Sequence, residues 1–182
     1  MRTILIFVLA IMMTLNLFAQ KYITQTGNIR FFSKTPVEHI EAFNNQVSGV
    51  LNTDNGEMAF SLLMKAFNFE KALMQEHFNE KYVESSKYPK ATFKGKIVNF
   101  NKNSITDKPL TVNVKGVLTM HGVSKDIEVK GSLQKANKGN ISGKSVFTVN
   151  LKDFNIKVPS AVRKNIDDNI EINVNMNYEK MD

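Results

Sequence analysis

Three histidines are the side chains of this sequence that suit metal binding or acid–base chemistry best. His39, His77 and His121 lie far apart, without the His-x-His or His-x-x-His spacing of a zinc site. The sequence contains no Gly-x-Ser-x-Gly segment, phosphate-binding loop or dinucleotide fingerprint. His121 is the best candidate for a general base, but no nucleophile motif accompanies it. We therefore predict no catalytic residue, metal ligand or cofactor, and interpret His121 as a turn residue that bonds to nearby backbone.

The element that would position His121 is the segment from residue 110 to 133. Apolar residues occupy alternate positions on both sides of the short segment Met120–Ser124, and polar residues lie between them. A period of two indicates strands with one buried face. The glycine within the break suits a tight connection, so the segment is predicted to form a β-hairpin with His121 in its turn.

This hairpin also carries a resemblance to a known family. The run GVLTMHGVSKDIEV, residues 116–129, resembles a hairpin motif of the YceI family, bacterial lipid-binding proteins with a lipocalin-like barrel. Three further segments resemble family motifs in the same order: Phe78 with Ser86–Phe93, Lys152–Ile156, and Ile166–Ile172. The resemblance covers nearly all of the chain after residue 21. Residues 29–49 match the family poorly, and Asn155 replaces the usual glycine of a turn.

Other segments with the period of a strand follow one another at short intervals. They are Lys21–Thr26, Asn28–Ser33, Asn44–Asn52, Glu57–Phe69, Ala91–Phe100, Gly143–Leu151 and Ile170–Tyr178. Helical spacing appears in Glu70–Tyr82, and Thr35–Ile40 has the capping residue and proline of a helical turn. The pattern suits a barrel or a two-sheet sandwich, and the resemblance favours the barrel. We predict an all-β fold: an antiparallel lipocalin-like barrel of about eight strands with one α-helix, spanning residues 21–180.

Residues 1–19 have the features of a signal peptide. Arg2 is followed by the apolar run Ile4–Ile11 and by Leu17-Phe18-Ala19, a small-residue cleavage site. A retained anchor is the alternative, at roughly one in ten on these criteria. We therefore expect an exported protein, either periplasmic or secreted. The absence of cysteine excludes disulfides, thiolate metal sites and lipid attachment through a cysteine.

The net charge of +7 comes mainly from scattered lysines. Nucleic-acid binding favours clustered arginine with interleaved aromatic residues, and arginine occurs after the signal only at Arg30 and Arg163. Scattered lysine is typical of a solvated surface that discourages strand-to-strand aggregation. We therefore predict that the protein does not bind nucleic acid.

The 13 phenylalanines and nine methionines suit a hydrocarbon ligand, or they simply fill the core. A barrel of eight strands is close to the size at which either outcome holds, so the residues alone leave this open. The resemblance implies an elongated apolar channel for an amphiphilic isoprenoid or quinone-like lipid. Peripheral contact of the protein with a membrane is compatible with such a ligand. The predicted lining is Phe60, Leu62, Met64, Phe67, Met74, Phe78, Phe93, Val112, Val114, Leu118, Phe147, Val149, Phe154, Ile172 and Val174.

Three functions remain open from the sequence. The first is a non-catalytic carrier of an isoprenoid-type lipid, as the resemblance implies. The second is a packed β domain whose basic face binds an acidic protein partner. The third is a lipid hydrolase or isomerase with His121 as its base.

Overall fold

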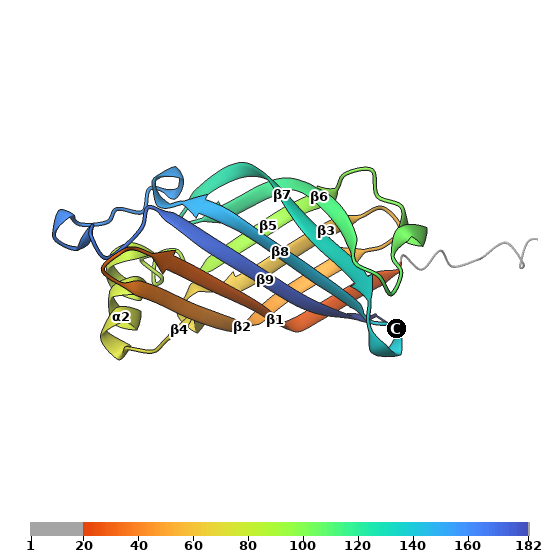
Figure 1. Cartoon of the computed structure of the whole chain (residues 1–182), viewed down its shortest axis with the longest axis horizontal. Helices are drawn as coiled ribbons and strands as arrows, with labels where there is room; N and C mark the ends of the chain where they lie inside the picture. The colour runs from red at the N-terminus through yellow and green to blue at the C-terminus, as the bar shows by residue number, and fades with distance from the viewer. Residues whose placement is uncertain (1–19, 182) are drawn as a thin grey trace, which may run out of the picture.

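The structure, a computed structural model, describes residues 20–181 and shows an elongated antiparallel barrel (Figure 1). The predicted signal peptide, residues 1–19, lies outside the described residues. The strands are β1 (Lys21–Lys34), β2 (His39–Asn52), β3 (Glu57–Leu63), β4 (Asn68–Phe69), β5 (Lys90–Ile97), β6 (Leu110–Met120), β7 (Val123–Lys135), β8 (Ile141–Asn150) and β9 (Asn169–Lys180).

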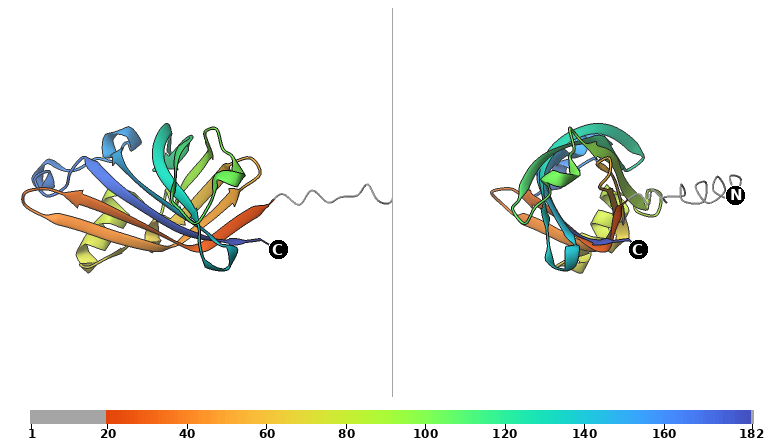
Figure 2. Two further views of the ribbon diagram at one scale, coloured as in Figure 1. Left: turned by 45° about the vertical axis from the view of Figure 1, so that its right-hand side comes forward. Right: turned by 90° about the vertical axis from the view of Figure 1, so that its right-hand side faces the viewer.

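Eight of these strands form a closed ring. Their order is β1-β9-β8-β7-β6-β5-β3-β2, and β1 pairs with both β9 and β2, which closes the barrel. The view along the barrel shows this closure (Figure 2). The short strand β4 is attached outside the ring and pairs only with Ala42 and Phe43 of β2. The predicted fold class, an all-β lipocalin-like barrel with one helix, is confirmed.

Alternation along the strands directs apolar side chains into the barrel and lysines outward. On β6, Val112 and Val114 are buried, whereas Lys115 is exposed. The side chains for which the same alternation predicts an inward orientation are all buried or half-buried, which confirms the prediction: Phe60, Leu62, Met64, Phe93, Val112, Val114, Leu118, Phe147, Val149, Ile172 and Val174.

The predicted single strand Glu57–Phe69 is wrong in its second half. Strand β3 ends at Leu63, which is paired with Lys90 of β5. The next residue, Met64, donates its backbone N–H to the carbonyl oxygen of Pro89 at 2.9 Å. Because proline has no N–H to return, the ladder stops there, and residues 64–66 form a 3₁₀ turn, η1 (Met64–Ala66). Met64 nevertheless remains inside the barrel.

The N-terminal part of the sheet also differs from the sequence prediction. Strand β1 continues through Gly27, where the register with β2 shifts, so Gly27 is a bulge and not a break between two strands. A side chain at Gly27 would collide with Met176 of β9. The predicted helical turn at Thr35–Ile40 is instead a hairpin loop. The hydroxyl oxygen of Thr35 accepts the backbone N–H of Glu38 at 3.0 Å, so the capping residue stabilises this loop.

The predicted helix Glu70–Tyr82 is observed as α2 (Ala72–His77), which continues as a π-helical turn, η2 (Phe78–Tyr82). It lies beside one end of the barrel (Figure 1). Phe78, in the π turn, packs against Phe31 of β1, Phe67 and Phe69, with ring centroids 5.0–5.7 Å apart. This aromatic cluster fixes the helix against the barrel.

The predicted β6–β7 hairpin is confirmed, and its turn consists of His121 and Gly122 alone. Both residues have positive φ, 52° and 74°, which is the conformation of the tight turn favoured in two-residue hairpins. Asn155 also has a positive φ, of 56°. Asparagine tolerates this conformation better than most residues, which explains how it replaces the glycine expected there.

Candidate ligand-binding site

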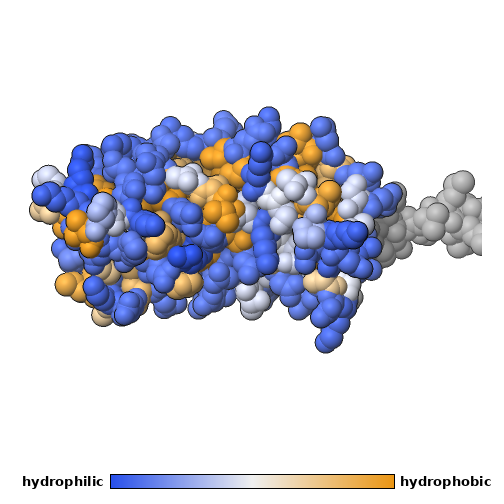
Figure 3. Space-filling model, viewed as in Figure 1, coloured by the Kyte–Doolittle hydropathy of each residue, from blue (hydrophilic) through white to orange (hydrophobic). Residues whose placement is uncertain are grey.

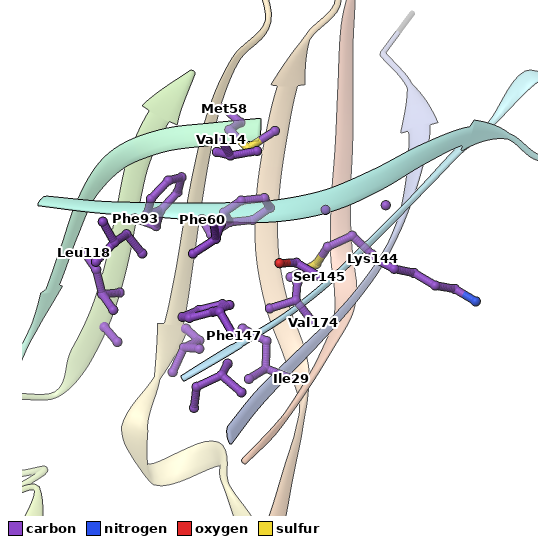
Figure 4. Close-up of a pocket in the computed structure, with 18 of the residues that line it drawn as sticks. Ile29, Met58, Phe60, Phe93, Val114, Leu118, Lys144, Ser145, Phe147 and Val174 are labelled. Carbon is purple, nitrogen blue, oxygen red and sulfur yellow. The ribbon is translucent and has the colours of Figure 1, made fainter. Parts of the chain in front are cut away.

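The first cavity lies in the middle of the barrel and has a volume of about 170 Å³. Phe60 of β3, Phe93 of β5, Leu118 of β6 and Phe147 of β8 project into it from different strands (Figure 4). The side chains around it are almost all apolar. Such a space offers shape and hydrocarbon contact to a ligand, with few hydrogen bonds.

The second cavity lies between one end of the barrel and α2, and it is larger, about 360 Å³. Phe31, Met74, His77 and Phe78 contribute to its wall, as does exposed Leu73 at its outer end. Its volume alone falls within the range of roughly 300–1,000 Å³ that is usual for small-molecule sites. Its wall, too, is mostly apolar.

The two cavities adjoin each other. The residues that line both are Met64, Phe67, Met120, Val149 and Ile172. Two of these are methionines, whose unbranched side chains adapt readily to the shape of a neighbour. The cavities therefore follow one another along the barrel, as a long and narrow ligand would require.

Tyr178 is the titratable aromatic residue in the wall of the first cavity. It is 1% exposed, and this burial raises its pKa well above the ordinary value of 10.0. Burial disfavours the phenolate, so the phenol remains neutral at physiological pH. Tyr178 therefore adds no charge to the cavity.

His121 lines neither cavity. Its Nδ1 lies 2.8 Å from the carbonyl oxygen of Phe154, and its Nε2 lies 3.0 Å from a carboxylate oxygen of Glu84. The ring also packs edge-on against Tyr88, with centroids 4.6 Å apart. Both nitrogens are thus engaged in holding separate segments together.

The other two histidines lie elsewhere. His77 is in the wall of the second cavity, and His39 begins β2 with its ring against Phe32. Within residues 20–181, the structure shows no group of three His, Asp or Glu side chains placed to hold a metal ion.

The structure brings most of the predicted lining residues together. Twelve surround the first cavity: Phe60, Leu62, Met64, Phe67, Phe93, Val112, Val114, Leu118, Phe147, Val149, Ile172 and Val174. Met74 and Phe78 are in the second. Phe154 lies in neither wall: it is the last residue of the short helix η5 (Leu151–Phe154), and its side chain is buried away from both cavities. Whether any of the others contacts a ligand stays a prediction.

Sequence reasoning missed several residues of the two walls. Ile29 and Phe31 come from the segment with the poorest family match, and the bulge at Gly27 interrupts its period. Met120, next to the hairpin turn, lines both cavities. The strict alternation of apolar and polar residues in β7 could have predicted that Ile127 and Val129 point into the barrel.

No helix among the described residues is long and apolar enough to cross a membrane. The face seen in Figure 3 is mostly hydrophilic, with smaller apolar areas among the hydrophilic residues. Val146 of β8 is among the exposed apolar residues, at 59%.

A closed antiparallel barrel around apolar cavities belongs to the lipocalin-like class of architectures. The YceI-like domain family matches residues 22–178, and the chain belongs to this family. Among curated proteins, a UPF0312 protein of Pseudomonas putida strain F1 is 34% identical over 96 residues, 50% of this chain and 47% of its own length. A UPF0312 protein of Pseudomonas syringae pv. tomato is 33% identical over 98 residues, 50% of this chain and 48% of its own. The chain thus spans about half the length of these relatives.

Three solved structures share the fold. A polyisoprenoid binding domain from Saccharophagus degradans, implicated in plant cell wall breakdown, has a TM-score of 0.76 at 15% identity, covering 88% of this chain and 98% of its own. Burkholderia cenocepacia BcnA has a TM-score of 0.70 at 16% identity, covering 84% and 96%. The Campylobacter jejuni YCEI protein has a TM-score of 0.56 at 18% identity, covering 76% and 83%.

Proposed function

We propose that the protein is an exported carrier that holds the hydrocarbon chain of an isoprenoid-type or quinone-like lipid in its two cavities. The observation that carries the proposal is the adjoining pair of apolar cavities along the barrel. A packed core with the same strands would leave no such space. Barrels of eight strands are just wide enough to hold one small ligand.

Hydrocarbon burial supplies enough free energy for such a ligand to be retained. Each Å² of apolar surface removed from water contributes about 25 cal/mol. A chain of a few isoprene units therefore gains several kcal/mol, which offsets the entropy lost on association. Branched, flexible isoprenoids suit walls made of Phe, Met, Val and Leu, because these side chains follow irregular shapes.

The solved structure from Saccharophagus degradans, described as a polyisoprenoid binding domain, supports this class of ligand. Its barrel resembles this one closely, although the sequences share only 15% identity. The family match over residues 22–178 supports the same conclusion.

The proposed role is non-catalytic. A general base must reach the proton that it removes, usually within about 3 Å. His121 lines neither cavity, and both of its ring nitrogens are engaged by Phe154 and Glu84. Tyr178 is neutral and buried, so it is poorly suited to proton transfer.

The experiment is to purify the full chain without detergent, extract it with organic solvent and identify the extract by mass spectrometry. We expect a prenyl lipid in near-stoichiometric amount. A protein that carries no lipid, and that also fails to bind retinol added in solution, would contradict the proposal.

A further inference from the structure

The barrel is not sealed uniformly around its circumference. Strand β7 pairs with β6 along nearly its whole length, from Met120↔Val123 to Leu110↔Leu133, and β8 pairs with β9 along its whole length. Between β7 and β8, however, the ladder runs only from Gly131↔Ser145 to Lys135↔Ile141. Residues 123–130 of β7 and 146–150 of β8 therefore face each other without ladder pairing.

The resulting gap has defined ends. At one end the hydroxyl of Ser145 donates to the carbonyl oxygen of Lys130 at 2.7 Å, just where the ladder stops. At the other end, η5 follows β8, and His121 bonds to the carbonyl of Phe154. Along β8 the gap measures roughly 17 Å, from five residues at about 3.3 Å each. Figure 1 shows β7 bowing away from β8 between these two ends.

The first cavity borders this gap. Its wall includes Ile127, Val129 and Gly131 of β7, together with Ser145 and Phe147 of β8. Ile127, Val129 and Phe147 alternate with exposed neighbours, so they point inward, yet they are only half-buried. Half-burial is shared by inward side chains of paired strands, such as Phe60, Ile172 and Val174, which line the same cavity. What distinguishes the wall between β7 and β8 is the missing ladder, which leaves no backbone pairing across this part of the cavity.

Two lysines flank the point at which the strands separate. Lys130 and Lys144 both point outward, and Figure 4 shows Lys144 directed away from the cavity. Register places them diagonally across the last pairs of the ladder, roughly 7–8 Å apart at the backbone. Their cross-strand neighbours are uncharged: Asn113, Ser132 and Asn175. Within the described residues neither lysine has an ion-pair partner, whereas Glu128, the next outward residue along β7, is paired with Lys115. The two lysines therefore place unpaired positive charge at this end of the gap.

We propose that the gap between β7 and β8 is a side portal for a single-chain lipid with an anionic head. The hydrocarbon chain passes between the strands into the first cavity, and the head remains outside against Lys130 and Lys144. This inference rests on the proposed lipid-binding function. It adds the route of loading and the charge of the head group.

The route is tested by closing the portal covalently. If the register of the ladder continued, Glu128 would lie opposite Thr148, with both side chains outward. The variant Glu128→Cys/Thr148→Cys, linked by a bis-maleimide, joins the two strands, and the absence of native cysteine makes the linkage specific. The matched control is Lys115→Cys/Glu128→Cys, which links β7 to β6, where the ladder is continuous. A second staple, Glu38→Cys/Lys71→Cys, crosses the outer end of the second cavity.

The measurement is the rate at which retinol fluorescence rises on mixing with each stapled protein, with linkage verified by mass. We expect the β7–β8 staple to slow loading at least tenfold, and the other two staples to change it less than twofold. Normal loading with the β7–β8 staple would overturn the portal, as would slowing by the Glu38–Lys71 staple alone. If retinol binds every variant at equilibrium, a failed portal leaves the lipid-binding proposal standing. If it binds none, and no lipid co-purifies, both are wrong.

The head-group assignment is tested with two ligands that share an isoprenoid chain. Retinoic acid is anionic and retinol is neutral, and the acid is measured by its displacement of retinol. We expect Lys130→Gln/Lys144→Gln to weaken the affinity for retinoic acid about fivefold, as the loss of two exposed charge contacts implies. The affinity for retinol should change by less than twofold. The control Lys96→Gln/Lys115→Gln removes two lysines that pair across β5 and β6. The assignment would be overturned if both double variants weakened the binding of retinoic acid equally, or if neither weakened it.

Discussion

Nδ1 of His121 lies 2.8 Å from the carbonyl oxygen of Phe154, so the β6–β7 turn is tied to the short helix that follows β8. The prediction that His121 is a turn residue is confirmed. The expected bond to nearby backbone is wrong, because its backbone partner lies 33 residues away. A second bond, to Glu84, reaches the segment after the π-helical turn. His121 thus joins three separate parts of one end of the barrel.

Replacing His121 by alanine should destabilise the protein by about 1–2 kcal/mol, because two hydrogen bonds are lost. Bound lipid should be unaffected. His121→Asn is the matched control, since asparagine accepts the positive φ and separates loss of the ring from backbone strain. Urea unfolding and lipid extraction are the measurements. Full stability combined with loss of a measurable lipid turnover would instead make His121 catalytic.

Leu62→Trp and Val114→Trp place a large ring in the first cavity. Because the ring occupies space left for hydrocarbon, co-purifying lipid should fall strongly while stability holds. In a packed core, the same change would cost about 1–3 kcal/mol and have no ligand effect. Leu63→Trp is the control, since Leu63 is the outward neighbour of Leu62. The melting temperature and the lipid content of each variant are compared with those of the unmodified protein. A large fall in melting temperature, in a protein that carries no lipid even when unmodified, would contradict the carrier role.

Gly116→Ala should destabilise the protein by about 1–3 kcal/mol, as overpacking does. Gly116 lies opposite Gly95, and a Cβ at either position would come within about 2.6 Å of the Phe93 ring. The ring and the two backbones have no room to move apart without disturbing the ladder. Gly139→Asn is the control, because a side chain at this turn position meets no neighbouring atom. Replacing this glycine should leave the stability nearly unchanged. Denaturant midpoints measure both, and equal effects would refute the close-packing argument.

Tyr178 predicts a loss of stability at alkaline pH. Burial raises its pKa above 10.0, so above that pH the unfolded chain ionises Tyr178 while the folded chain does not. The free energy of unfolding then falls as pH rises, by up to about 1.4 kcal/mol per pH unit from this residue. Tyr178→Phe should remove this part of the loss while leaving stability at pH 8 nearly unchanged. Urea unfolding at pH 8 and pH 11 gives the difference; identical slopes would contradict the prediction.

The barrel could be predicted from sequence wherever strands alternate without interruption. The hairpin of residues 110–133 is the clearest case, because nearly every inward Val or Leu is flanked by outward polar residues, with Val117 beside Leu118 as an exception. The predicted strand after Glu57 is too long, because the proline that stops its ladder, Pro89, immediately precedes the partner strand β5. A single strand's pattern carries no information about what its partner lacks.

The site was predictable in part for a related reason. Alternation identifies which side chains point into the barrel, but not whether they meet in the middle or leave space. Phe154 shows the difference: it is apolar and buried, yet it belongs to η5 and lines neither cavity. Phe31 was missed because the bulge at Gly27 shifts the period of β1. The gap between β7 and β8 has no signature in either strand, because both continue to alternate across it.

The pairing of β1 with β9 has a consequence for how the protein is made. These strands are the first and last of the described barrel, and Met181 donates its N–H to the carbonyl of Lys21 at 2.9 Å. The ring therefore cannot close until β9 has been synthesised, and its closing contacts span almost the entire domain. Pairings so distant in sequence fold slowly. A nascent chain that lacks β9 cannot form the closed barrel, which favours the export that we propose above, because a translocation channel accepts an unclosed chain more readily than a closed barrel.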